Sequence, residues 1–293
     1  MANLKAIRQR IRSVQNTQKI NRAMRLVAAA KVRRAQMRTL AGRPFTQRIV
    51  RLLRQVCEEV ADIDLQGLPL LERREVKKVC LIVFSSDRGL CGSYNTNVVK
   101  RTARRIEELR SEGKEVGLIT IGLKAAAFFK RVKVEKFKTF TLMSAIPSIQ
   151  EAKLVSEVAC ELYKSKQIDS VEIIATRFVN MIRQDVEDLQ YLPVELPEGY
   201  DHHPLSSETL FEPDLMELME AELLPKYVEN TIYQAFLEST ASELAARMNA
   251  MTNASNNARE LIQALTLEYN KARQASITQE LLEIVGGAEA LAK

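Results

Sequence analysis

Residues 79–84 read Val-Cys-Leu-Ile-Val-Phe, an uninterrupted apolar run rich in β-branched side chains. Such a run is typical of a strand that is buried on both faces, as in a parallel sheet covered by helices on both sides. A polar turn follows over residues 85–95, and an amphipathic helix is predicted after it. The middle of the chain therefore reads as the start of an α/β domain.

Strands and helices continue to alternate downstream of this run. The sequence predicts strands over residues 116–121, 171–175 and 191–196, and helices over residues 125–130 and 150–164. Alternation of this kind implies βαβ units, a mostly parallel sheet and right-handed crossovers. We therefore predict a small Rossmann-like α/β domain over residues 76–198.

The first 60 residues read as one long helix. No glycine precedes Gly42 and no proline precedes Pro44, while apolar residues recur every three or four positions from Leu4 to Val27, which is the helical spacing. A helix of this kind would extend roughly 80 Å. A compact domain cannot cover such a length, so part of the helix is expected to protrude.

A second long helical stretch begins after Pro213. Its only proline is Pro225, and it has no glycine before Gly286 and Gly287, where it is expected to end. Two long helices flanking one domain predict a mixed α+β fold, in which the terminal helices form a long antiparallel coiled coil beside a central Rossmann-like domain. The expected segments are the N-terminal coiled-coil helix 1–60, a connector 61–75, the α/β domain 76–198, a connector loop 199–212, and the C-terminal coiled-coil helix 213–293.

Charge is distributed unevenly along the chain. The net charge is +6, yet residues 1–57 carry 15 Lys or Arg and no Asp or Glu, so the remaining 28 basic and 37 acidic residues give a net charge of −9. A cationic arm predicts an anionic partner, either nucleic acid or an acidic surface. The arm has no aromatic residue before Phe45 for stacking on bases, which argues against nucleic acid. The basic arm comprises Arg8, Arg10, Arg12, Lys19, Arg22, Arg25, Lys31, Arg33 and Arg34.

The four cysteines form no Cys-x-x-Cys pair, and the only histidines are the adjacent His202 and His203. A zinc site is therefore not expected, and the scattered thiols fit a reducing compartment. Cys80 is expected to be a small core residue, with redox control as the alternative reading of the thiols. No apolar run approaches the roughly 20 residues of a membrane span, and no apolar segment follows the basic N-terminus as in a secretory signal.

The turn over residues 85–95 has two interpretations. A glycine-containing turn between a buried strand and a helix could hold a phosphate, which would make the domain an enzyme. The segment matches neither G-x-G-x-x-G nor the P-loop pattern. The plainer interpretation is a tight turn whose polar residues cap the next helix.

Four blocks resemble the gamma subunits of F-type ATP synthases. They lie at the start, the middle and the end of the chain, in the order found in that family. The blocks are Ser13–Ile20 with Ala23-Met24 and Val27–Lys31, then Ser86–Asn95, then Ala241–Met248, and finally Ile277–Ala290.

This resemblance implies a rotating central shaft that couples transmembrane proton flow to ATP synthesis or hydrolysis on the beta subunits. The chain would be non-catalytic, bind no cofactor and no nucleic acid, and not insert into the membrane. Its implied partners are three alpha and three beta subunits, an epsilon subunit and a ring of c subunits. Through them it would be a peripheral protein on the cytoplasmic, stromal or matrix face of the membrane.

The resemblance also assigns contact residues. Positions implied to meet or communicate with the beta subunit are Met24, Arg247, Arg273, Gln274, Thr278 and Glu280, and positions of the foot near the epsilon subunit and c ring are Phe211, Glu212 and Asp214. The plainer alternatives are exposed helix residues forming i,i+4 pairs, a core methionine and a first-turn acid. Because the chain has no cysteine after Cys160, a thiol switch of the chloroplast type is not expected.

Overall fold

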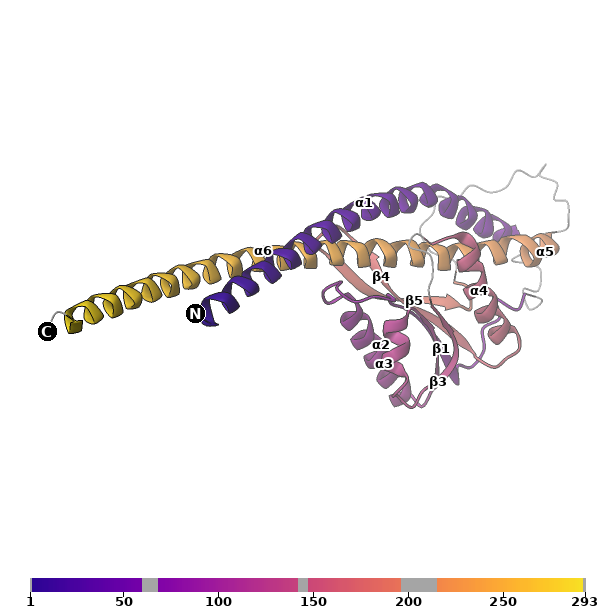
Figure 1. The fold of residues 1–293 in the computed structure, drawn as a ribbon. Helices are drawn as coiled ribbons and strands as arrows, with labels where there is room; N and C mark the ends of the chain where they lie inside the picture. Colours follow the sequence, from indigo (N-terminus) through magenta and orange to yellow (C-terminus); the bar gives the residue numbers. More distant parts are fainter. Residues whose placement is uncertain (1, 60–67, 142–146, 196–214, 292–293) are drawn as a thin grey trace. The chain divides into compact units, whose positions relative to one another are not determined.

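The computed structural model describes residues 2–59, 68–141, 147–195 and 215–291 (Figure 1). Two compact units make up the chain: a helix-pair unit, Met1–Ala28 with Met248–Lys293, and a sheet unit, Ala29–Arg247. The long helices α1 (Ala2–Glu59) and α6 (Leu224–Leu291) each contribute to both units. The two predicted terminal helices are therefore present.

The sheet unit contains a five-stranded sheet with the order β3-β2-β1-β4-β5. The first four strands in this order are mutually parallel, and β5 runs antiparallel to β4. This confirms the Rossmann-like domain. The strands are β1 (Lys78–Phe84), β2 (Glu115–Ile121), β3 (Glu135–Phe140), β4 (Ser170–Phe178) and β5 (Gln184–Leu192).

Strand β1 lies at the centre of the sheet and is buried on both faces. Its even-numbered residues, such as Ile82, belong to the core that includes α4 and the sheet-unit parts of α1 and α6. Its odd-numbered residues, such as Leu81, belong to the core formed with α2 and α3. The covering helices are α2 (Tyr94–Ser111), α3 (Leu123–Phe129) and α4 (Ile149–Lys164).

Helix α6 packs against the sheet through aromatic and aliphatic side chains. The rings of Phe84 and Phe236 meet edge to face with centroids 4.8 Å apart, an arrangement that aromatic pairs favour. Within the same unit α1 runs antiparallel to α6, because Asn230 Nδ2 donates to Thr46 Oγ1 at 2.8 Å and Gly42 lies against Gln234.

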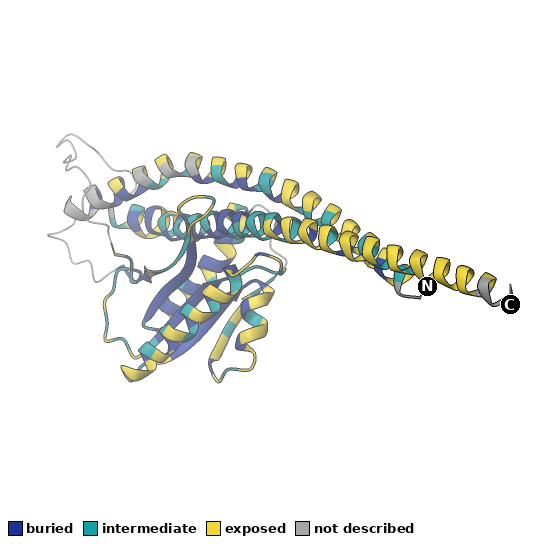
Figure 2. Ribbon diagram, turned by 90° about the vertical axis from the view of Figure 1, so that its left-hand side faces the viewer, coloured by how far each residue is buried: buried dark blue, intermediate teal, exposed yellow. Residues whose placement is uncertain are grey.

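In the helix-pair unit, α1 and α6 lie side by side in opposite directions (Figures 1 and 2). Gln18 Nε2 donates to the backbone oxygen of Ser255 at 3.2 Å. Partly or fully buried residues recur at spacings of three and four, as in coiled coils. They are Leu4, Ile7, Ile11, Val14, Gln18, Asn21, Met24 and Ala28 on α1, and Met251, Ser255, Ala258, Ile262, Leu265, Tyr269, Ala272 and Ser276 on α6.

Three local predictions need correction. The helix end expected at Gly286 and Gly287 is wrong, because α6 continues to Leu291. A helical glycine costs only about 1 kcal/mol relative to alanine, and good helix formers follow. Strand β3 was not expected, and β5 begins at Gln184 rather than at residue 191. Both are edge strands with several charged residues and no apolar run, as edge strands often are.

Helix α6 is preceded by an irregular turn. The short helix α5 (Leu215–Leu218) leads into a π-helical turn, Met219–Leu223, before α6 begins. Pro225 has no backbone N–H to donate to the preceding turn, and the wider turn precedes this position directly. The second helical stretch therefore starts close to its expected position.

Gly122 follows strand β2 and lies against the backbone of Ser85, which follows strand β1. It has φ of +90° and ψ of 147°, a region open almost only to glycine, and a Cβ there would lie 2.3 Å from the backbone oxygen of Ser85. We expect Gly122→Ala to lower the free energy of unfolding by about 3 kcal/mol.

Gly113→Ala is the matched control, because Gly113 also has positive φ but no atom lies within 4 Å of its added Cβ. The left-handed conformation alone should cost about 1 kcal/mol. Urea unfolding of both variants compares the two, and equal losses would contradict the proposed clash.

Candidate partner-binding surfaces

The end of α6 presents an uncovered apolar surface. The coiled-coil spacing stops at Ser276, and the described residues from Ile277 to Ala288 are exposed. We call residues 277–291 the α6 tail. Its large apolar side chains are 49% to 68% exposed, namely Ile277, Leu281, Leu282, Ile284 and Val285. Exposed apolar clusters are typical of surfaces that bind another protein, a membrane or a ligand.

Four predicted contact residues lie at or beside this tail. Arg273, Gln274, Thr278 and Glu280 are all exposed. Thr278 Oγ1 donates to the backbone oxygen of Gln274 at 2.9 Å, and Ser276 Oγ donates to Glu280 Oε1 at 3.5 Å. These bonds within one helix leave the side chains of Arg273 and Gln274 facing solvent. The structure therefore brings these four residues together on one exposed segment.

Arg247 belongs to the sheet unit. Its Nε donates to Glu243 Oε1 at 2.9 Å, and each side chain of this i,i+4 pair is only 14% exposed. Met24 is half-buried in the helix-pair unit, at a position of the coiled-coil spacing. These two residues have less surface to offer a partner than the four near the tail.

The basic arm is open to solvent (Figure 2). Of its nine residues only Lys31 is half-buried, and the other eight are exposed. Residues Arg8 to Arg25 of the arm belong to the helix-pair unit, and Lys31 to Arg34 belong to the sheet unit. Within the described part of the chain, the ion pairs involve none of these nine side chains. Their charge is available to a partner.

Polar groups of the turn after β1 accept hydrogen bonds from the first backbone N–H groups of α3. Asp87 Oδ1 accepts from the backbone N–H of Leu123 at 3.0 Å, and Ser85 Oγ accepts from that of Ala125 at 3.0 Å. The backbone oxygen of Ser86 accepts from that of Lys124 at 3.1 Å. The backbone N–H groups that could bind a phosphate at the start of α3 are therefore already hydrogen-bonded within the chain.

The expectation that this turn caps the next helix needs correction. Ser93 precedes α2 but makes no side-chain capping hydrogen bond. The polar residues of the turn cap α3 instead, because the ends of the parallel strands β1 and β2 lie at the same edge of the sheet. The remaining bonds close the turn on itself, with Asn95 Oδ1 accepting from the backbone N–H of Ser86 at 3.0 Å.

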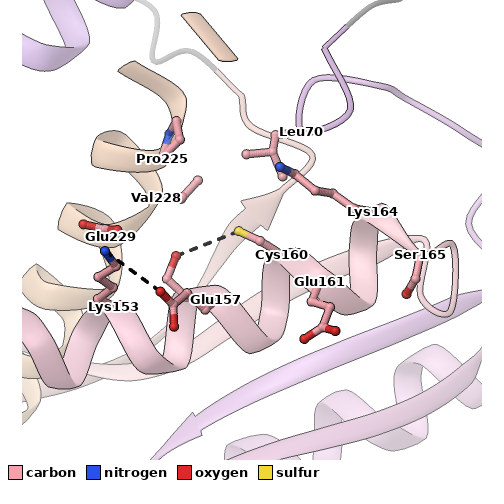
Figure 3. Close-up of a pocket in the computed structure, with 11 residues that line it drawn as sticks. Leu70, Lys153, Glu157, Cys160, Glu161, Lys164, Ser165, Pro225, Val228 and Glu229 are labelled. Carbon is pink, nitrogen blue, oxygen red and sulfur yellow. Dashed lines mark hydrogen bonds and ion pairs between the residues drawn. The ribbon is translucent and has the colours of Figure 1, made fainter. Parts of the chain in front are cut away.

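Three cysteines have described surroundings. Cys80 and Cys91 are buried and Cys160 is half-buried, and burial raises the pKa of all three thiols. The prediction that Cys80 is a core residue is confirmed, because it is fully buried within β1. Cys160 lines a cavity of about 740 Å³ between α4 and the first turns of α6, beside Pro225 and Val228 (Figure 3).

Three further predictions concern the foot residues, membrane spans and metal sites. The foot residues Phe211, Glu212 and Asp214 lie outside the described residues. Among the described helices, none is long and apolar enough to cross a membrane. The described His, Cys, Asp and Glu side chains form no group of three or more that could hold a metal ion.

Sequence reasoning missed two groups of residues. The first group is the apolar residues of the α6 tail, which extend beyond the part of α6 that pairs with α1. A comparison of the lengths of the two predicted helices would have shown this. The second group is Glu238, Ser239 and Ser242, which bond to the end of β4. No local pattern distinguishes these three from ordinary polar helix residues.

Comparisons with known proteins give one consistent match. A family model described as ATP synthase matches residues 3–291. The ATP synthase gamma chain of Cyanothece sp. is 46% identical over 317 aligned positions, covering 99% of this chain and 100% of the relative. That of Trichormus variabilis is 45% identical, with coverage of 99% and 100%.

Solved structures show the same fold. A chain from the central stalk and c-ring structure of the Tetrahymena thermophila mitochondrial ATP synthase is 25% identical and has a TM-score of 0.59, covering 80% of this chain and 99% of that chain. A chain from the Euglena gracilis mitochondrial ATP synthase structure is 22% identical with a TM-score of 0.65, covering 99% of this chain and 95% of that chain.

The thiols provide a test of the described burial. Because the thiolate is the reactive form, a raised pKa slows modification. In a Cys57→Ser variant at pH 8, we expect a water-soluble disulfide reagent to modify Cys160 first and slowly, and Cys80 and Cys91 only after unfolding in guanidinium. Mass spectrometry of the labelled peptides identifies the sites. Rapid labelling of Cys80 in the native protein would contradict its burial.

Proposed function

The chain belongs to the ATP synthase gamma family and is the central rotor shaft of an F-type ATP synthase, and we propose that its principal beta-subunit contacts lie on α6 near its C-terminal end. It is a non-catalytic subunit that couples proton flow to ATP synthesis or hydrolysis at sites on other subunits. The observation that carries this assignment is 46% identity to a named gamma chain over nearly the whole length of both proteins.

The proposed partners follow from this role. They are a ring of three alpha and three beta subunits around the helix pair, and an epsilon subunit and a c ring at the opposite end of the shaft. The α6 tail supports the first contact, since its exposed apolar side chains would be removed from water inside such a ring. The two functions considered from the sequence alone, nucleic-acid binding and catalysis in the α/β domain, explain neither the tail nor the family match.

The exposed basic arm supports contacts that change during rotation. Ion pairs at exposed positions contribute only about 0 to 1 kcal/mol each, and salt screens them. Such contacts can form and break as the shaft meets successive subunits, while several together still favour one orientation. We propose that Arg8 to Arg34 of the basic arm face acidic surfaces of the surrounding ring.

The proposed coupling residues divide into two kinds. Arg273, Gln274, Thr278 and Glu280 are exposed and are proposed to touch the beta subunit directly. Arg247 is held by Glu243 and largely covered, so we propose that it acts by positioning α6. Met24 is proposed to contact the beta subunit with the exposed part of its half-buried side chain.

The location of the protein follows from its partners. We propose that it is a peripheral protein on the cytoplasmic face of an energy-transducing membrane, or on the equivalent stromal or matrix face. The partner subunits would hold it there. Phe211, Glu212 and Asp214 remain the proposed foot residues.

Assembly tests the role as a shaft. We expect co-expression of this chain with alpha and beta subunits to give a complex of three alpha, three beta and one gamma subunit, whose ATPase activity depends on the gamma subunit. Native mass spectrometry and an ATPase assay measure both. A chain that remains alone in the presence of folded alpha and beta subunits would overturn the role.

The direct contacts are tested with Gln274→Ala and a matched control, Gln263→Ala, at an exposed position of α6 that lies outside the α6 tail. Losing one exposed polar contact costs about 1 kcal/mol, so we expect Gln274→Ala to slow ATP synthesis by roughly fivefold. Gln263→Ala should leave the rate within about twofold of the unmodified complex. Equal rates for the two variants, in fully assembled complexes, would contradict the contact assigned to Gln274.

A further inference from the structure

The end of β4 is hydrogen-bonded to side chains of α6. The backbone N–H of Thr176 donates to Ser239 Oγ at 3.4 Å, and its backbone oxygen accepts from Ser242 Oγ at 3.1 Å. The backbone N–H of Phe178 donates to Glu238 Oε2 at 2.8 Å. We call these five residues the β4–α6 joint, and all of them belong to the sheet unit.

The joint exists because β4 is longer than its neighbour β1. The pairing of β1 with β4 ends at Val83 and Ile174, whereas the pairing with β5 continues to Phe178. Beyond Ile174, alternate backbone groups on the β1 side have no strand to bond. Buried backbone groups require partners, and Ser239 and Ser242, which are 4% and 0% exposed, supply them.

Strand β4 is in turn held firmly to α2. Arg105 bonds Glu172 of β4 through two nitrogens, each 2.8 Å from a carboxylate oxygen, the bidentate geometry that gives the strongest and most directional pairs. Arg101 Nε donates to Asp188 Oδ1 of the paired strand β5 at 3.0 Å. The strand that ends on α6 is therefore fixed to a covering helix as well as to two neighbouring strands.

The hydrogen bonds and the apolar contacts of α6 differ in how strongly they oppose rotation of the helix about its own axis. Other contacts between α6 and this end of the sheet are apolar, such as Leu244 with Phe178 and Phe236 with Phe84. Apolar burial is non-directional, so a helix can roll on such a surface at small cost. Hydrogen bonds weaken steeply when donor and acceptor are turned apart. The joint therefore opposes rotation of α6 about its own axis.

We propose that the β4–α6 joint transmits torque between the α/β domain and α6, with Glu238, Ser239 and Ser242 as positioning residues for coupling. This proposal rests on the role of the chain as a rotor shaft. Arg247 follows Glu238 by nine residues on the same helix, so the joint also sets the direction in which the Glu243–Arg247 pair points. The proposed path runs from α2 through Glu172 and β4 to α6.

Glu238 provides the sharpest variants. Glu238→Met removes the acceptor for the N–H of Phe178 at similar volume, whereas the amide oxygen of Glu238→Gln still accepts this bond. Ser239→Ala removes a second bond, and Thr240→Ala, the next residue on the same helix, is its control. Peptide hydrogen exchange over residues 175–179 reports whether the bonds are lost.

The functional measurement is ATP-driven proton pumping per ATP hydrolysed, in membrane vesicles that contain the assembled synthase. If the joint slips, the beta subunits still hydrolyse ATP but the α/β domain follows the helix less faithfully. We expect Glu238→Met and Ser239→Ala to lower the pumping ratio by at least about twofold, with normal assembly and ATPase activity. Glu238→Gln and Thr240→Ala should pump as the unmodified synthase does.

Two results would overturn the proposal. One is an unchanged pumping ratio in Glu238→Met and Ser239→Ala despite faster exchange over residues 175–179. The other is an equal loss in Glu238→Gln, which keeps the bond. If Glu238→Met does not assemble, Ser239→Ala against Thr240→Ala decides the question. Because only assembled complexes are compared, a failure of the shaft role itself would appear earlier, as missing assembly.

Discussion

Strand β1 has no face toward water, and this burial governs the rest of the sheet unit. A strand with Ile82 on one side and Leu81 on the other must be covered by helices on both faces, since each exposed face would leave apolar area in contact with water. Helices α2 and α3 cover one face. The other face is covered by α4 together with α1 and α6, so the long helices are part of the core of the domain rather than additions to it.

The same sheet uses its strand ends to hold other parts of the chain. In Rossmann-like folds ligands bind where the carboxyl ends of the parallel strands meet the following helices. Here Asp87 and Ser85 occupy the backbone donors of α3, and α6 bonds the end of β4 through Ser239 and Ser242. The carboxyl edge of the sheet, where other folds of this kind bind a ligand, is hydrogen-bonded to the chain's own turn and to α6. The domain is thereby attached to the long helix of the shaft.

The helix-pair unit satisfies a different requirement. Its seam includes polar and small residues such as Gln18, Asn21 and Ala258 among the apolar ones, while the basic arm remains exposed. A shaft that meets several subunits in turn benefits from many weak contacts rather than one strong contact, since a single tightly bound face would stop rotation. The α6 tail adds apolar surface where the partner helix no longer covers it.

The two long helices, the buried strand β1, the basic arm and the family could be predicted from the sequence, because helical spacing, an apolar run, charge counts and family-like sequence blocks are local features of the chain. The sequence did not determine the edge strands β3 and β5, whose charged residues carry no apolar signal, or the continuation of α6 through Gly286. Only the tertiary structure decided which polar residues act together. Asp87 caps a helix 36 positions away and Glu238 bonds a strand 60 positions away, and such pairings arise from how strands end against helices rather than from any spacing in the chain.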